Sequence, residues 1–71
     1  MYLQRLRDMR EDSDLSQTQI AEMLGIHQTV YSRYERGART IPLELLIKLA
    51  EFYDVSLDFL AGRTNIKKLS R

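Results

Sequence analysis

Apolar residues recur at helical spacing in five stretches of the 71-residue chain, and short polar segments separate these stretches. Residues three or four apart lie on the same face of a helix, so this spacing indicates helices that pack through one side. The pattern predicts helices at about residues 1–12, 17–24, 28–36, 42–53 and 57–61. We therefore expect an all-α fold, a compact domain of five helices around one core.

The segment from Ser16 to Gly37 has the clearest helix start and stop signals. Ser16 and Gln19 have the spacing of a capping box, in which each side chain accepts a hydrogen bond from a backbone N–H at the helix start. Gly25 and Gly37 follow apolar stretches, and glycine readily adopts the left-handed conformation that ends a helix. Ala21 is small where two helices joined by a short turn must approach closely. These features predict two short helices that cross at a steep angle.

The helix expected at residues 28–36 has an apolar face and a polar face. Tyr31 and Tyr34 continue the apolar pattern, so we interpret them as core residues rather than as platforms for stacked bases. The polar face carries Gln28, Thr29, Ser32, Arg33 and Arg36. Because glutamine and arginine can form paired hydrogen bonds with base edges in the major groove, this face favours DNA binding.

With these features the chain resembles the helix-turn-helix domains of phage repressors and Cro-type proteins. The residues that carry the resemblance are Gln17, Ala21, Gly25, Ile26, Gln28, Tyr31 to Glu35, and Gly37. The similarity extends from about Leu3 to Gly62 and includes further apolar residues on both sides. We expect a helix-turn-helix domain at residues 1–62 and a basic C-terminal tail at residues 63–71.

The resemblance implies a transcriptional regulator, in the first place a repressor, that binds a double-stranded DNA operator. Its third helix would enter the major groove and its second would lie across the backbone. Four residues align with base-facing positions: Gln28, Thr29, Ser32 and Arg33. Gln17 aligns with a phosphate-contacting position and could brace Gln28. The other phosphate candidates lie at the two ends of the third helix and in the following loop: His27, Arg36, Arg39 and Thr40.

The family also commonly pairs a basic residue at the position of Arg10 with a glutamate at the position of Glu35. Both residues are present here. Such an ion pair would fasten the first helix to the end of the third, whereas the alternative is a solvated Arg10 on a charged helix face. Repressor domains of this kind usually bind as two-fold dimers, so a homodimer, formed either in solution or only on DNA, is a further expectation. The candidate contacts of the dimer are exposed apolar residues near the fifth helix, notably Phe59, and the tail at residues 63–71.

Charge and composition limit the other possibilities. The net charge is only +1, but residues 41–62 carry −3 and residues 63–71 carry +4. This uneven distribution suits a protein that touches DNA on one side. The chain has no cysteine and a single histidine, His27, so we expect no disulfide, metal or cofactor. The N-terminus is not signal-like and no apolar run reaches the length of a membrane span, which makes the cytoplasm the default location.

Other function classes are weaker explanations of the same residues. No serine–histidine–aspartate arrangement is credible with one histidine at a helix cap, so we do not expect an enzyme. A protein-interaction module, such as an adaptor or antitoxin, would favour an apolar face where the third helix has long polar side chains. A purely structural bundle would leave Gln17, Gln28 and Arg33 without a role. DNA binding is therefore the leading hypothesis.

Overall fold

The computed structural model describes residues 2–67 of the chain. Within this range the protein forms five helices and no strand, which confirms the predicted all-α class. The helices are α1 (Gln4–Asp12), α2 (Gln17–Leu24), α3 (Gln28–Glu35), α4 (Leu43–Tyr53) and α5 (Leu57–Leu60). None of these helices is long and apolar enough to cross a membrane.

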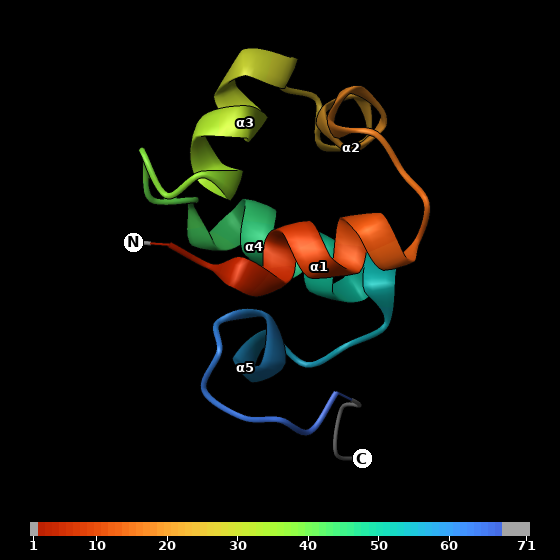
Figure 1. Ribbon diagram of the computed structural model, residues 1–71, viewed down its shortest axis with the longest axis vertical. Helices are drawn as coiled ribbons and strands as arrows, with labels where there is room; N and C mark the ends of the chain where they lie inside the picture. The colour runs from red at the N-terminus through yellow and green to blue at the C-terminus, as the bar shows by residue number, and fades with distance from the viewer. Residues whose placement is uncertain (1, 68–71) are drawn as a thin grey trace.

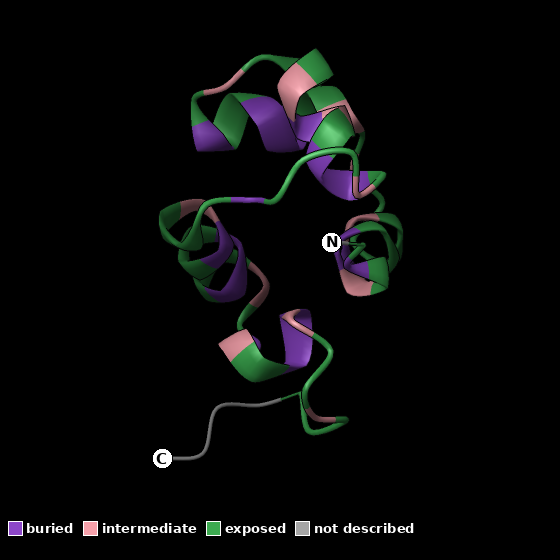
Figure 2. Ribbon diagram, turned by 90° about the vertical axis from the view of Figure 1, so that its left-hand side faces the viewer, coloured by how far each residue is buried: buried purple, intermediate pink, exposed green. Residues whose placement is uncertain are grey.

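The helices are arranged along an elongated body of 34 × 22 × 20 Å (Figure 1). The pair α1 and α4 occupies the middle, with α2 and α3 at one end and α5 at the other. The largest fully buried side chains come one from each helix: Leu6, Ile20, Tyr31, Leu49 and Leu60. Figure 2 shows that the buried faces of the helices turn toward one another. A single core therefore holds all five helices together.

The local signals in the α2–α3 segment act as predicted. The Ser16 hydroxyl accepts a hydrogen bond from the Gln19 backbone N–H at 3.1 Å, and the Gln19 side chain accepts one from the Ser16 N–H at 2.8 Å. Gly25 has a φ of +72°, and this left-handed residue ends α2. Ala21 is buried where α2 and α3 pack together. The start of α2 and the turn into α3 are therefore specified by neighbouring residues.

Four predicted helix limits differ from the structure. The third helix ends at Glu35 rather than at residue 36. The first helix begins at Gln4 rather than Met1, and Met1 lies outside the described residues. Pro42 has an extended backbone and precedes α4 instead of forming its first turn. The last helix ends at Leu60, before Gly62. Tyr2 and Leu3 are not helical because their chain lies against the loop after α3, where the Tyr2 backbone occupies the space beside Gly37.

The prediction that Phe59 is exposed was wrong. Phe59 is buried, and the Arg5 guanidinium lies 4.0 Å from the centroid of its ring. Arg5 also donates hydrogen bonds to the Phe59 carbonyl at 2.8 Å and to the Asn65 side chain at 2.6 Å. Helix α4 also carries more large apolar residues than the core takes up. Three of its large apolar side chains are exposed: Leu43, Ile47 and Phe52.

The beginning of the expected tail lies against the helices. The Ser56 backbone N–H donates to the Lys67 carbonyl at 2.7 Å, and the Ser56 hydroxyl donates to the Ile66 carbonyl at 3.3 Å. Arg5 holds the same segment through Thr64 and Asn65. Residues 63–67 therefore pack on α1 and α5. The remaining positions of the expected tail, 68–71, lie outside the described residues.

The close approach of Tyr2 to Gly37 gives a matched test of the fold. A Cβ at Gly37 would lie 2.9 Å from the Tyr2 Cα, whereas a Cβ at Gly25 would meet nothing within 4 Å. Both glycines have positive φ, so alanine at either position costs about 1–2 kcal/mol from backbone conformation. We expect Gly37→Ala to lower the free energy of unfolding more than Gly25→Ala, as measured by urea denaturation. Equal losses would show that Tyr2 does not constrain this loop.

Candidate nucleic-acid interface

The four side chains aligned with base-facing positions lie on one side of α3. Gln28, Thr29 and Arg33 are exposed, and Ser32 is half-buried. The opposite side of the helix carries its buried residues: Tyr31, Tyr34 and Glu35. Helix α3 therefore presents a polar surface at the end of the molecule that it shares with α2 (Figure 1).

The phosphate candidates surround this surface. Gln17 is the first residue of α2, and His27 directly precedes α3 without a side-chain capping bond. Arg36 follows the last turn of α3, and Arg39 and Thr40 lie in the exposed loop before α4. That loop is held to α3 by hydrogen bonds from the backbone N–H groups of residues 38 and 39 to the Arg33 carbonyl. The candidates thus form a rim at both ends of the α3 surface.

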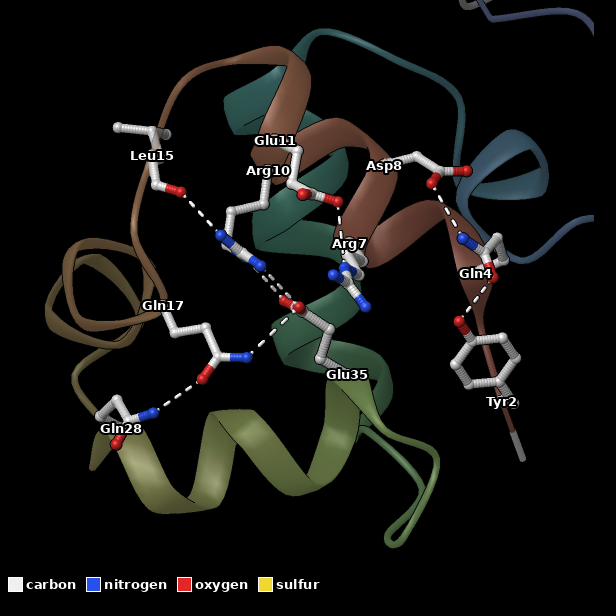
Figure 3. A network of polar contacts seen from close by, with 10 residues as sticks. All are labelled: Tyr2, Gln4, Arg7, Asp8, Arg10, Glu11, Leu15, Gln17, Gln28 and Glu35. Atoms are coloured by element: carbon white, nitrogen blue, oxygen red, sulfur yellow. Dashed lines mark hydrogen bonds and ion pairs between the residues drawn. The ribbon is translucent and has the colours of Figure 1, made fainter.

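A chain of polar contacts joins the α3 surface to the interior (Figure 3). The Gln28 Nε2 donates to the Gln17 Oε1 at 2.7 Å, and the Gln17 Nε2 donates to the Glu35 Oε1 at 3.3 Å. Glu35 accepts two more hydrogen bonds from Arg10, at 2.9 and 2.8 Å. Arg10 also donates to the Leu15 carbonyl at 2.9 Å. The chain of contacts runs from an exposed side chain of α3, through α2, to α1.

The chemistry of Glu35 determines how the two amides are oriented. An ionised carboxylate only accepts hydrogen bonds, so Gln17 must turn its amide nitrogen toward Glu35. Its amide oxygen then faces Gln28 and accepts from the nitrogen of that side chain. Gln28 is left with its amide oxygen and a second N–H. These are the acceptor and donor that a glutamine uses to bind adenine in the major groove.

Glu35 remains ionised although it is buried. Only 4% of its surface is exposed, and burial by itself raises the pKa of a carboxyl group. Burial is the largest single influence, but the hydrogen bonds from Arg10 and Gln17, the nearby Tyr31 hydroxyl and the positive charge of Arg10 together outweigh it and lower the pKa of Glu35 below its ordinary value. The same contact raises the pKa of Arg10. Both partners therefore carry their charges throughout the physiological pH range.

Two buried tyrosine hydroxyls lie in the same part of the core. Tyr31 and Tyr53 make no hydrogen bond of regular geometry with the described residues. Burial raises the pKa of both phenols, to about 12 for Tyr53. They stay neutral where Arg10 and Glu35 are charged. The ion pair is therefore the charged centre of this region.

The sequence alone did not single out Arg7. It is exposed on α1, lies near the Arg10–Glu35 pair and shares a cleft with it. Its position one helical turn before Arg10 is the signal that could have indicated this neighbourhood.

Among residues 2–67, no group of three or more histidines, cysteines and acidic residues could hold a metal ion.

The ion pair gives a test of the interior arrangement. We expect Arg10→Met and Glu35→Gln each to lower the free energy of unfolding by about 3 kcal/mol, because each leaves a buried polar partner unpaired. The double variant should lose less than the sum, since both changes remove the same contact. Urea denaturation of the four proteins measures this double-mutant cycle. Strictly additive losses would contradict the contact.

Measuring the same stabilities at acid pH tests whether the ionised carboxylate of Glu35 is the source of the effect. Glu35 has a lowered pKa in the folded protein, so its contribution is present above the pKa of the unfolded state and is lost as pH falls. The difference in stability between the natural protein and Glu35→Gln should therefore shrink below about pH 4.5. A difference that persists unchanged in acid would mean that the ionised carboxylate is not its source.

The comparisons with known proteins agree with this architecture. A model of the helix-turn-helix family matches residues 6–60 of the chain. The chain is 43% identical over 65 residues to YobD of Bacillus subtilis, an uncharacterized HTH-type transcriptional regulator, covering 92% of this chain and 58% of YobD. It is 37% identical over 68 residues to RstR of Vibrio cholerae, a cryptic phage CTXphi transcriptional repressor, covering 93% of this chain and 61% of RstR.

A third relative is AnsR of Bacillus subtilis, an HTH-type transcriptional regulator that is 38% identical over 68 residues, covering 96% of this chain and 59% of AnsR. The chain thus spans 58–61% of the length of these three relatives. No solved structure matches the chain. Because the family model covers most of the sequence and the relatives match along nearly all of it, the chain belongs to the helix-turn-helix family of phage-repressor and Cro type.

Proposed function

We propose that this protein is a sequence-specific regulator of transcription that binds double-stranded DNA through α3. The observation that carries the proposal is the polar surface of α3, whose first residue, Gln28, is held by Gln17 of α2. In helix-turn-helix proteins the second helix of the motif enters the major groove while the first crosses the backbone. The arrangement of α2 and α3 suits that placement.

The proposed roles follow from where each side chain lies. Gln28, Thr29, Ser32 and Arg33 would read base edges, and Gln28 is oriented by Gln17 to recognise adenine. Gln17, His27, Arg36, Arg39 and Thr40 would contact phosphates around the groove. Phosphate contacts position the domain, whereas base contacts give sequence preference. The two groups of residues therefore have separable effects on binding.

We propose repression as the regulatory outcome and a two-fold dimer on DNA as the binding form. A relative, RstR, is named as a transcriptional repressor. A dimer would place its half-sites about 10–10.5 base pairs apart, one turn of the double helix. Phe59 is not part of this dimer proposal because it is buried beneath Arg5. Dyad symmetry in selected binding sites would support the dimer, and one-to-one binding to sites without symmetry would exclude it.

The first test is binding itself. Selection from a random pool of duplex DNA should recover a preferred site, and its affinity should fall steeply as salt is added. Each neutralised phosphate contributes about −0.9 to the slope of log K against log salt concentration, because bound counterions are released. Fluorescence anisotropy of a labelled duplex at several salt concentrations measures this slope. Failure to bind any selected duplex at low salt would favour a protein partner instead.

A second test separates base reading from phosphate contact by comparing two arginines. Arg33 lies on the α3 surface, where its guanidinium can donate two hydrogen bonds to guanine. Arg33→Ala should cost about 1–3 kcal/mol on the preferred site and relax preference at one base position. Arg39 lies in the loop, so Arg39→Ala should weaken binding to all sequences and reduce the salt slope by about 1.

The readout for both variants is affinity across a panel of single-base changes at two salt concentrations. Each serves as the control for the other, since both remove one exposed positive charge. A uniform loss for Arg33→Ala together with altered base preference for Arg39→Ala would reverse the two assignments. The orientation of α3 in the groove would then have to be redrawn.

A further inference from the structure

A cleft of about 300 Å³ opens beside the Arg10–Glu35 pair, where α1, the first residue of α2 and the end of α3 meet. We refer to it as the arginine cleft. Its lining residues are Tyr2, Arg7, Arg10, Gln17, Glu35 and Arg36. Two of the three arginines, Arg7 and Arg36, are exposed to solvent. The proposed binding surface of α3 borders the cleft through Gln17 and Arg36.

The arginine cleft has more positive charge than its own acidic group can neutralise. Glu35 is its single carboxylate, and both oxygens of that carboxylate are occupied by Arg10. One of them also accepts from Gln17. Within residues 2–67, the side chain of Arg36 forms no ion pair. The charge of Arg36 is therefore available to an anion, and Arg7 is paired only with Glu11, which does not line the cleft.

The contact that Arg7 makes in the free protein is easily exchanged. Its Nε lies 3.0 Å from the Glu11 Oε1, and the side chains of the two residues are 58% and 54% exposed. Exposed pairs one helical turn apart are weak because water screens them. Figure 3 shows the Arg7 guanidinium on the side of α1 that faces the Arg10–Glu35 pair. Arg7 can thus leave Glu11 at little cost.

We propose that the arginine cleft binds a backbone phosphate of DNA, with Arg7 of α1 as a ligand that exchanges Glu11 for that phosphate. The inference rests on the proposed function. If α3 lies in the major groove, the DNA strand that contacts Gln17 runs on to the arginine cleft. This follows because Gln17 is a phosphate candidate beside α3 and also lines the cleft. A guanidinium matches phosphate geometry because it donates two parallel hydrogen bonds. The contact involves no base, so it adds affinity without sequence preference.

The direct test is Arg7→Gln, measured on the duplex selected with the natural protein. Affinity should fall several-fold for every sequence alike, and the salt slope should decrease in magnitude by about 0.9, the value of one phosphate contact. Arg7→Lys should keep the salt slope, since it keeps the charge, while losing part of the affinity. The matched control is Arg63→Gln, which removes one positive charge after α5, at the opposite end of the molecule from α2 and α3.

A second pair of variants tests the exchange of partners. Glu11→Gln frees Arg7, so it should tighten DNA binding. The control is Asp12→Asn, which removes the same charge from the next residue of α1. Asp12 forms no ion pair with Arg7 in the natural protein. Glu11→Gln should therefore tighten binding more than Asp12→Asn. The extra gain should disappear when Arg7→Gln is also present, because the two changes then act on the same contact.

The outcomes separate this inference from the proposed function. If the natural protein binds no selected duplex, the proposed function fails. If it binds but Arg7→Gln leaves affinity and salt slope unchanged, or lowers them no more than Arg63→Gln, the proposed function stands and the arginine cleft is not a phosphate site. A thermal melt of each variant must match the natural protein, since an exposed residue pair contributes little to folding. A changed base preference in Arg7→Gln would also overturn the inference.

Discussion

The buried ion pair between Arg10 and Glu35 is the interaction on which the arrangement of this domain depends. It brings a charge from α1 and a charge from α3 into an interior with few other polar groups. Burying charges costs free energy, which is recovered only when the geometry and the remaining hydrogen bonds are good. Here each carboxylate oxygen is bound by Arg10, and Arg10 also binds the carbonyl of Leu15 before α2. The pair therefore restricts α1, α2 and α3 to one relative placement.

This restriction reaches the surface through side-chain chemistry. A carboxylate at the inner end of the contact chain accepts hydrogen bonds and cannot donate, so the orientation of Gln17 and then of Gln28 follows from it. A protonated or neutral residue at position 35 would leave both amides free to turn over. Glu35, which is buried on the inner face of α3, thus determines which hydrogen-bonding groups Gln28 presents on the outer face. The interior and the recognition surface are parts of one polar network.

The sequence predicted those elements whose determinants are local. The limits of α2 and the turn into α3 follow from Ser16, Gln19 and Gly25, which act on backbone groups within a few residues. Tyr31 and Tyr34 were recognised as core residues because helical periodicity marks the buried face. The family resemblance, rather than periodicity, indicated that Arg10 and Glu35 belong together. Which side chains touch DNA is a property of a complex, so neither periodicity nor the free fold determines it.

The errors arose where the decisive partner is distant along the chain. Phe59 looked like an exposed aromatic residue because the arginine that covers it comes 54 positions earlier. The start of α1 was misplaced because Tyr2 is held by the loop at Gly37. Leu43, Ile47 and Phe52 continue a helical apolar pattern without reaching the core. Each case requires a tertiary contact that no window of neighbouring residues contains.

Arg5 has a consequence for how the chain is made. Its guanidinium binds the carbonyl of Phe59 and the side chain of Asn65, which follow it by 54 and 60 positions in the chain. Because synthesis proceeds from the N-terminus, Arg5 of α1 can form these contacts only after almost the entire domain has been synthesised. The contacts of α2 with α3 close much shorter loops and can form earlier. The growing chain should acquire its helix-turn-helix before it acquires its final shape, and Arg5 joins the two ends of the domain last.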